Sequence, residues 1–377
     1  MIDSVGEDKQ MRTVNATLFV GFFTSAELMA GPVGFIQKNL VSNEPGAAQS
    51  QDTTLINPWG LIATESSPFW LGVNGSGVSE LYNGAGVRQG LTVTIQGDGS
   101  VTGVALGGIA GSFNGDVFLF ASEDGTISGW RGALGSTAEV LQTGLVSNVY
   151  KGLTTASISG NGYLYLANFH SGTIDVVKGN SSTPSLTGNF LDPNLPSGYA
   201  PFNIMNLGNG ELYVSYAVQD SSGEDDVAGA GNGIIDVFDL NGNLLRRLVG
   251  PGGVLNSPWG LALAPAGFGD LGGDLLVGNF GDGTIHAFNP TSGQLVETLR
   301  DPNGNPISID GLWALRFGNG ANAGPATTLF FTAGPNGEAD GLFGQLTASP
   351  EPGTWLMMTS ALGLIQILRK SRRRYIQ

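Results

Sequence analysis

A pattern of apolar and polar positions recurs through the middle of the chain at intervals of roughly 43–58 residues, the size of a propeller blade. Each repeat begins with a glycine-containing apolar strand, continues with a second apolar strand, and then has a tight turn and a third strand. Asp-Gly and Ser-Gly pairs at these turns favour hairpins, because turns that match the strand twist need positive φ angles. The first strands of the repeats are expected at residues 59–63, 103–106, 152–156, 202–205, 259–263 and 311–315.

These repeats predict an all-β fold, a six-bladed β-propeller, because six units fall within the range of blades that propellers have. A parallel β-helix is the alternative, although its repeat is much shorter. The last repeat offers only three strands, whereas the strand-like segment 34–41 precedes the first repeat. We therefore expect this N-terminal strand to pair with the last repeat and close the ring, since an unpaired sheet edge would otherwise stay open.

The two ends of the chain have the patterns of targeting segments, so the propeller is expected to span residues 31–348. Residues 1–30 are predicted to be a signal peptide, because Met11-Arg12 precedes an apolar stretch at 14–23 that is followed by small residues. The segment before Met11 is acidic, unlike the start of a signal peptide, which indicates Met11 as the true start. A buried helix is the alternative interpretation of this stretch.

The C-terminal segment 349–377 combines a Pro-Glu-Pro motif, an apolar stretch at 355–368 and a terminal arginine cluster. It resembles the PEP-CTERM sorting tail of Gram-negative bacteria, and the resemblance implies an exosortase-type membrane protease as partner. The apolar stretch would act as a transmembrane sorting helix, with the arginines on the cytoplasmic side and the propeller outside. It is shorter than the ~20 residues that usually span a bilayer, and a terminal helix docked on the domain is the alternative. The sorting residues are Pro350, Glu351, Pro352, Arg372, Arg373 and Arg374.

Composition and charge narrow the classes of function. The 377 residues include 61 glycines and no cysteine, which suits a turn-rich β protein and excludes disulfides and cysteine nucleophiles. Residues 31–348 carry 9 basic and 26 acidic side chains, a net charge of −17. Such a surface repels phosphate backbones, so nucleic-acid binding is not expected, whereas cations and neutral or basic polymers are compatible with it.

Two motifs extend the resemblance beyond the tail. Asn-Pro-Trp-Gly occurs at 57–60, and Asn-Phe-x-x-Gly-Thr-Ile occurs at 168–174 and again at 279–285. Together with the tail, most of residues 36–346 resemble a family of exported, propeller-like proteins that often carry PEP-CTERM tails. The resemblance implies a periplasmic, outer-surface or extracellular location and a link to exopolysaccharide or biofilm, and it brings no particular activity.

The face of the propeller where the first strands begin is expected to collect the candidate binding residues. Tryptophan offers a large flat apolar face that can stack on sugar rings, which would suit a polysaccharide ligand. Packing between blades is the alternative role for the tryptophans, and local hydrogen bonding is the alternative for the asparagines. The candidates are Trp59, Trp259, Trp313, Asn168 and Asn279.

One predicted hairpin, residues 219–232, is longer and more acidic than the others. Its carboxylates could wrap Ca²⁺, which takes six to eight oxygen ligands, although the spacing matches no EF-hand. A solvated acidic loop is the alternative. The candidate ligands are Asp220, Glu224, Asp225 and Asp226, and no other cofactor is expected.

The sequence contains no nucleophile-elbow, zinc-protease or P-loop motif. The favoured hypothesis is therefore an exported cell-surface or matrix propeller, a non-catalytic protein that binds a polysaccharide or another protein. The alternative is a Ca²⁺-dependent propeller lactonase or hydrolase, in which the metal activates water at the channel mouth. The candidate metal ligands for that alternative are Asn57, Asn203, Asn279 and Asp310.

Overall fold

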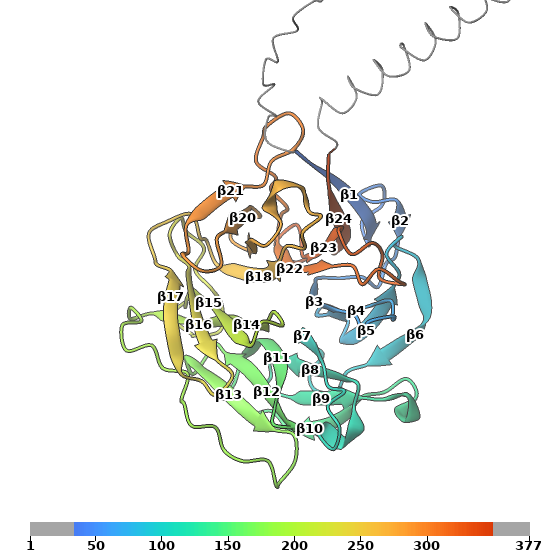
Figure 1. Cartoon of the computed structure of the whole chain (residues 1–377). Coiled ribbons are helices and arrows are strands. Elements are labelled where there is room, and N and C mark those ends of the chain that lie inside the picture. Colours follow the sequence, from blue (N-terminus) through green and yellow to red (C-terminus); the bar gives the residue numbers. More distant parts are fainter. Residues whose placement is uncertain (1–33, 350–377) are drawn as a thin grey trace, which may run out of the picture. The chain divides into compact units, whose positions relative to one another are not determined.

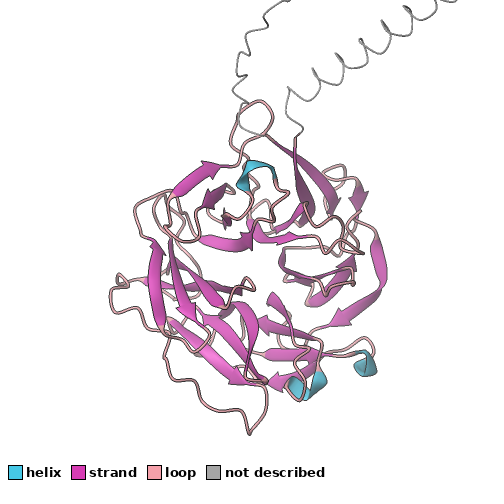
Figure 2. Ribbon diagram, viewed as in Figure 1, coloured by secondary structure: helices cyan, strands magenta, loops and turns pink. Residues whose placement is uncertain are grey.

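The structure, a computed structural model, describes residues 34–349, which form six sheets around a central channel (Figures 1 and 2). All strand pairs in these sheets are antiparallel except β1–β2. In each sheet the strand that comes first in sequence, apart from the closing strand, contacts the first strands of the two neighbouring sheets. These six inner strands therefore form a ring that lines the channel. The predicted all-β, six-bladed propeller is confirmed, while the predicted signal peptide and sorting tail lie outside the described residues.

The first three blades follow one another along the chain, each built from the channel outward. The first blade contains β3 (Pro58–Ile62), β4 (Phe69–Val73), β5 (Val78–Tyr82) and β6 (Arg88–Thr94). The second contains β7 (Val101–Leu106), β8 (Phe118–Ser122), β9 (Ile127–Trp130) and β10 (Glu139–Gln142). The third contains β11 (Tyr150–Ile158), β12 (Asn161–Asn168) and β13 (Thr173–Lys178).

The remaining three blades complete the ring. The fourth blade contains β14 (Tyr199–Asn206), β15 (Glu211–Val218), β16 (Ile234–Asp239) and β17 (Leu244–Val249). The fifth contains β18 (Pro258–Leu263), β19 (Leu275–Asn279), β20 (Ile285–Phe288) and β21 (Leu295–Thr298). The sixth contains β22 (Leu312–Phe317), β23 (Leu329–Ala333), β24 (Leu342–Ala348), β1 (Phe35–Ser42) and the two-residue β2 (Ser50–Gln51). Short 3₁₀ helices lie at Phe113–Gly115, Gly132–Leu134 and Gly269–Leu271.

The ring closes in the sixth blade, where the N-terminal strand β1 pairs antiparallel with β24 from Phe35–Ala348 to Ser42–Leu342. The predicted closure is thus confirmed. The backbone amide of Ser349 also donates to the carbonyl of Gly34 at 2.7 Å, so both ends of the described chain leave the propeller at the same point (Figure 1).

Glycines let the inner strands approach the channel axis. A Cβ on Gly60 would come within 2.6 Å of the backbone nitrogen of Val104 in β7, and one on Gly260 within 2.6 Å of the carbonyl oxygen of Trp313 in β22. Neighbouring inner strands touch at these points through backbone, which explains why the repeats pair tryptophan with glycine at the start of β3 and β18. Among the described residues, no helix is long and apolar enough to cross a membrane.

Candidate functional site at the acidic mouth of the channel

Aromatic side chains from five blades meet in the channel and form what we call the aromatic plug. Trp59 and Trp313 stack with their ring centroids 3.6 Å apart, and Trp259 meets them edge-on at 6.4 and 5.7 Å. Their exposed fractions are only 2%, 1% and 4%. The structure therefore brings the three predicted tryptophans together, but it buries them among other side chains. The plug comprises Trp59, Phe169, Phe202, Trp259, Phe280 and Trp313.

The polar edges of the tryptophans tie the plug to the mouth where the inner strands begin. Trp313 Nε1 donates to Asn57 Oδ1 at 3.0 Å, and Trp259 Nε1 donates to the carbonyl oxygen of Lys151 at 2.9 Å. Trp59 Nε1 is buried without a hydrogen-bond partner among residues 34–349. Two of the three indoles therefore contribute a hydrogen bond to the plug. The third, with a buried N–H that has no acceptor, carries an energetic cost.

A connected set of charged and amide side chains lies against this plug, and we call it the mouth cluster. Lys151 Nζ donates to Glu123 Oε1 at 2.5 Å and to Asp225 Oδ1 at 3.2 Å. Asn74 Nδ2 donates to Glu123 Oε2 at 3.1 Å, which links the first blade to the second. The cluster draws on blades one, two, three, four and six, and its members are Asn57, Asn74, Glu123, Lys151, Asp225 and Glu338.

Lys151 is the only cation in the mouth cluster, and it is 2% exposed. Burial opposes its charge, but the Coulomb attraction and hydrogen bonds of Glu123 and Asp225 outweigh burial and raise the pKa of the ammonium. The ammonium also lies 5.3 Å from the ring centroid of Trp59, within the range of a cation–π contact. Lys151 therefore stays protonated and holds the acidic hairpins of blades two and four against the plug.

Backbone strain marks the sixth-blade side of the mouth cluster. Asn57 and Glu338 both have positive φ angles, 47° and 69°, which are unusual for residues other than glycine. Asn57 Nδ2 donates to Glu338 Oε2 at 2.6 Å. Burial raises the pKa of the Glu338 carboxyl, and this hydrogen bond offsets part of the effect. Strained residues of this kind persist where the surrounding structure fixes them, and they concentrate at functional sites.

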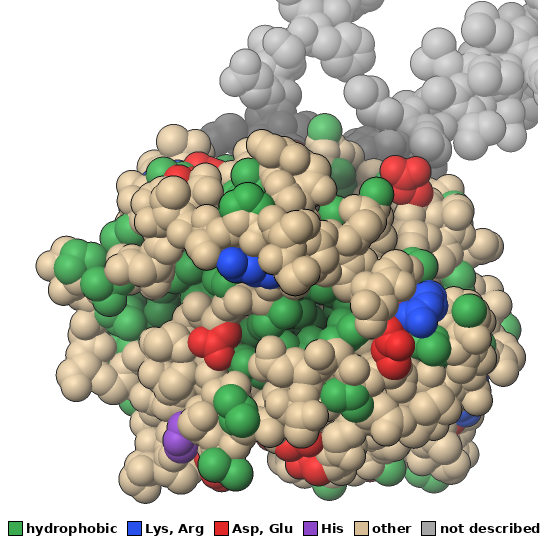
Figure 3. Space-filling model, turned by 90° about the horizontal axis from the view of Figure 1, so that it is seen from below, with side chains coloured by type: hydrophobic (Ala, Val, Ile, Leu, Met, Phe, Trp, Pro, Cys, Tyr) green, Lys and Arg blue, Asp and Glu red, His purple; other side chains and the backbone are tan. Residues whose placement is uncertain are grey.

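A cavity of about 590 Å³ opens beside the mouth cluster, between the loops of blades two, three and four, and we call it the acidic pocket. Five carboxylates line it, and Lys151 is the cation that contacts two of them. On the side drawn in Figure 3, acidic and basic side chains form only small patches. The pocket is lined by Asp98, Ser100, Glu123, Asp124, Gly144, Leu145, Val146, Asn148, Val149, Glu224 and Asp225.

Turn geometry fixes two of these carboxylates. Asp98 Oδ1 accepts from the amide of Ser100 at 2.9 Å, and Asp124 accepts from the amides of Asp98 and Thr126 at 3.0 and 2.8 Å. Glu123 lies beside Asp124 in the same tight hairpin, whereas Glu224 and Asp225 come from the longer β15–β16 hairpin, and the Asp225 side chain is 78% exposed. The pocket therefore combines a preformed acidic wall with carboxylates that stay hydrated.

The predicted calcium loop contributes to this pocket, but its four carboxylates have different roles. Asp220 is used inside its own turn, where it accepts from the amides of Ser222 and Glu224 at 3.1 Å each. Glu224 and Asp225 line the acidic pocket, and burial raises the pKa of Asp226, which is half-buried. Within residues 34–349 no group of three or more Asp, Glu or His side chains is arranged to hold a metal ion.

The asparagines and the aspartate that the sequence singled out all make hydrogen bonds with other groups of the protein. Asn168 accepts from the amide of Val149, and Asn279 donates to the carbonyl of Val254 at 3.0 Å. Each also makes a local contact of the kind common beside turns: Asn168 accepts from the amide of Ser171, and Asn279 donates to the hydroxyl of Thr284. Asn203 donates to the carbonyl of Trp259 at 2.8 Å, while Asp310 accepts from the amide of Asn336 at 2.8 Å. Asn57, Asn203, Asn279 and Asp310 are the candidate Ca²⁺ ligands of the hydrolase alternative. Each of them makes its hydrogen bond to a different partner.

Sequence reasoning missed Lys151, Glu123 and Glu338. Lys151 carried a usable signal, since it is a charge inside an otherwise apolar inner strand, and such a charge needs a partner. Glu123 and Glu338 sit in hairpins where acidic residues are ordinary, so only the arrangement of blades reveals that they converge.

The fold and the site define an acidic six-bladed propeller with a closed channel. The chain is 34% identical to uncharacterized protein R648 of Acanthamoeba polyphaga mimivirus over 329 residues, 81% of this chain and 78% of that protein. It is 33% identical to uncharacterized protein L690 of the same virus over 331 residues, 81% of this chain and 84% of that protein. The chain therefore belongs to the family of these mimivirus proteins.

Of two further comparisons, one finds no match and the other shows a shared fold. No protein-family model matches the chain. A solved α-L-arabinanase from Penicillium chrysogenum, complexed with arabinobiose, is similar with a TM-score of 0.52 at 13% identity. That similarity covers 83% of this chain and 97% of the arabinanase. At so low an identity it shows a shared fold alone.

Proposed function

We propose that the protein is an exported, non-catalytic binding protein that takes a basic segment of another protein into the acidic pocket. The observation that carries this proposal is the excess of negative charge: five carboxylates line a cavity of about 590 Å³, and only two of them pair with the ammonium of Lys151. Complementary charge steers partners together and sets their orientation. A ligand with two or more cationic side chains fits this excess.

Apolar side chains at the edge of the pocket favour a polypeptide over a polysaccharide. Leu145 is 59% exposed and Val146 is fully exposed, at 104%. Apolar surface of this kind suits the aliphatic stems of lysine and arginine, whose charged ends would reach the carboxylates. The tryptophans that would serve a sugar lie inside the aromatic plug, so polysaccharide binding through them stays a prediction.

Binding of fluorescently labelled tetralysine, followed by polarisation, tests the proposal. The double variant Glu224→Gln/Asp225→Asn should weaken binding about tenfold, because two exposed charge contacts contribute about 0.7 kcal/mol each. Raising NaCl from 0.05 to 0.5 M should weaken it further, since salt screens exposed charges.

A charge-matched control distinguishes the pocket from general attraction to an acidic protein. Glu65→Gln/Asp270→Asn removes the same charge from exposed positions in the β3–β4 and β18–β19 connections, at the other end of the inner strands. Tetralysine should bind this control as it binds the native protein. Equal weakening by both pairs, or binding of an acidic or neutral glycan in place of tetralysine, contradicts the proposal.

We also propose that the two terminal segments direct the protein out of the cytoplasm. Support comes from the signal-like pattern at 1–30 and from the resemblance of 349–377 to a PEP-CTERM tail. In a bacterium with an exosortase, the protein should reach the envelope or medium with its tail processed, as intact-mass analysis would show. Replacing Pro350, Glu351 and Pro352 by alanine should leave the tail in place. A mature protein that retains Met1, or a processed alanine variant, contradicts the proposal.

A further inference from the structure

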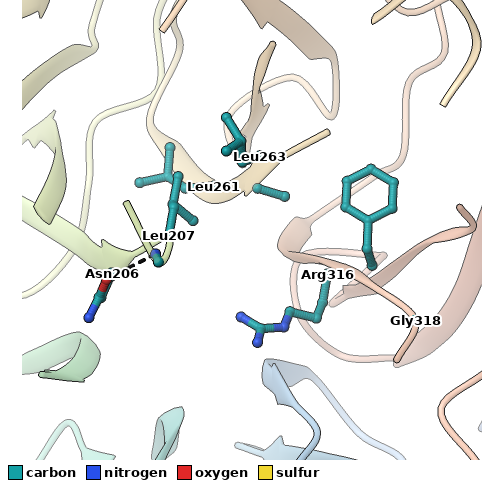
Figure 4. Close-up of a pocket in the computed structure, with 9 residues that line it drawn as sticks. Asn206, Leu207, Leu261, Leu263, Arg316 and Gly318 are labelled. Atoms are coloured by element: carbon teal, nitrogen blue, oxygen red, sulfur yellow. Dashed lines mark hydrogen bonds between the residues drawn. The ribbon is translucent and has the colours of Figure 1, made fainter. Parts of the chain in front are cut away.

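Arg316 lies at the opposite end of the channel, where the inner strands end. Its guanidinium extends from β22 into the space across from Asn206 (Figure 4). Two adjoining cavities of about 340 and 130 Å³ share these two residues, so they are parts of one hollow, which we call the arginine mouth. All six inner strands or the residues just after them contribute to its lining, among them Ile62, Leu106, Leu153, Leu207, Leu263 and Phe317.

The Arg316 guanidinium has no partner among the described residues. The other five arginines of residues 34–349 each donate a side-chain hydrogen bond, namely Arg88, Arg131, Arg246, Arg247 and Arg300. Burial lowers the pKa of Arg316, yet an arginine stays charged at any ordinary pH. Neither cavity has an aspartate or glutamate in its lining. No side chain that lines the hollow therefore compensates the charge of Arg316, and a bound anion would do so.

Asn206 lines both cavities and carries a second donor. Asn206 Oδ1 accepts from the amide of Gly208 at 3.0 Å (Figure 4). Asn206 Nδ2 donates to the carbonyl of Thr155 at 3.0 Å. An amide nitrogen carries two hydrogens, so one donor remains for a ligand. Because both of its other contacts are made to backbone, the orientation of this donor is fixed.

We propose that the arginine mouth binds a small organic carboxylate. Its carboxylate would accept two parallel hydrogen bonds from Arg316 and one from Asn206, since the planar guanidinium matches a carboxylate in geometry. Its apolar body would lie against Leu207, Leu263 and Phe317. One guanidinium and one amide suit a single negative charge better than the nearly two charges of a phosphate monoester.

This site is separate from the acidic pocket. The aromatic plug fills the channel between the mouth cluster, at the start of the inner strands, and Arg316, at the end of β22. The two ends also have opposite charge, so they suit different ligands.

Ligand-observed NMR and calorimetry with hexanoate test the inference. The native protein should bind hexanoate and should not bind hexanol or inorganic phosphate at equal concentration. Arg316→Gln should weaken hexanoate binding roughly ten- to a hundredfold, because hydrogen bonds between charged groups are lost. Arg316→Lys should give an intermediate loss, since it keeps the charge without the paired donors. It also serves as the probe if Arg316→Gln folds poorly.

Arg300→Gln removes an arginine that donates to the carbonyl of Gly304 on the outside of the fifth blade, and it should bind hexanoate as the native protein does. The inference is overturned if Arg316→Gln binds hexanoate as tightly as the native protein does, or if the native protein binds hexanol as tightly as hexanoate. It is also overturned if the protein binds phosphate through Arg316 and does not bind hexanoate. Tetralysine binding should be the same in Arg316→Gln and native protein, so failure of one site is distinguishable from failure of the other.

Discussion

A chain that begins at Asn43 is expected to lose its cooperative fold, whereas a chain that begins at Gly34 should keep it. The difference is β1, which supplies the outer strand of the sixth blade. Phe35, Leu40 and Val41 are each 1% exposed. Burying three such side chains contributes about 5–9 kcal/mol, compared with the roughly 5–15 kcal/mol that is the whole stability of a typical domain.

Loss of β1 also leaves the edge of β24 unpaired. Seven residue pairs, from Phe35–Ala348 to Ser42–Leu342, hold the two strands together. An exposed strand edge pairs readily with another chain, so the shortened protein should aggregate as well as unfold. Circular dichroism on heating and size-exclusion chromatography check both effects. A melting temperature within a few degrees of the Gly34 chain, with a monomeric elution volume, would show that β1 is dispensable.

The repeat made the fold predictable because each inner strand carries its own signal. Apolar residues on both faces, glycine at the contact with the next strand and a hairpin turn recur together, as at 59–63 and 259–263. Outer strands are half exposed and vary more, which is why the third blade ends after β13 without a sequence signal for it. The loop that follows packs Phe190 against Tyr165 and Phe238, a contact that depends on two blades at once.

The candidate site was less predictable, for a physical reason. The sequence places Trp59, Trp259 and Trp313 at equivalent ends of three inner strands, and in the structure their rings contact one another. Whether an indole faces solvent or another indole depends on side chains from other blades, which no local pattern encodes. Lys151 and Arg316 could have been singled out, because each is a charge within an apolar inner strand.

Family membership and the proposed cellular location rest on different parts of the chain. The similarity to the mimivirus proteins covers 81% of this chain and concerns the sequence of the fold. The export proposal rests on the two terminal patterns alone, which lie outside the described residues. The binding proposals depend on neither the family nor the location, because purified protein with residues 34–349 intact is enough to test the acidic pocket and the arginine mouth.

The structure makes the two ends of the channel chemically unlike. Carboxylates from two hairpins and one connection between blades line the acidic pocket, and one ammonium pairs with two of them. One guanidinium without a partner among residues 34–349 faces the arginine mouth. The aromatic plug keeps them apart, so its integrity supports both sites. Loss of a plug residue should therefore affect stability first and binding second.

Trp313→Ala is expected to destabilise the fold by about 3–5 kcal/mol, the usual cost of removing a large buried aromatic side chain. Trp313 is 1% exposed and stacks on Trp59 at 3.6 Å and on Phe280 at 4.0 Å. Its removal also leaves Asn57 Oδ1, which is buried, without the indole donor. Thermal and urea unfolding measure the loss.

Trp313→Phe is the matched control, because it keeps a stacking ring and removes only the indole hydrogen bond. It should cost about 1–3 kcal/mol, the price of a buried acceptor left unsatisfied. Below its melting temperature Trp313→Ala should still bind tetralysine, since hairpins of blades two and four hold the carboxylates. The opposite result, an unchanged stability with loss of binding to a glycan, would show that the tryptophans serve a ligand and that packing is their lesser role.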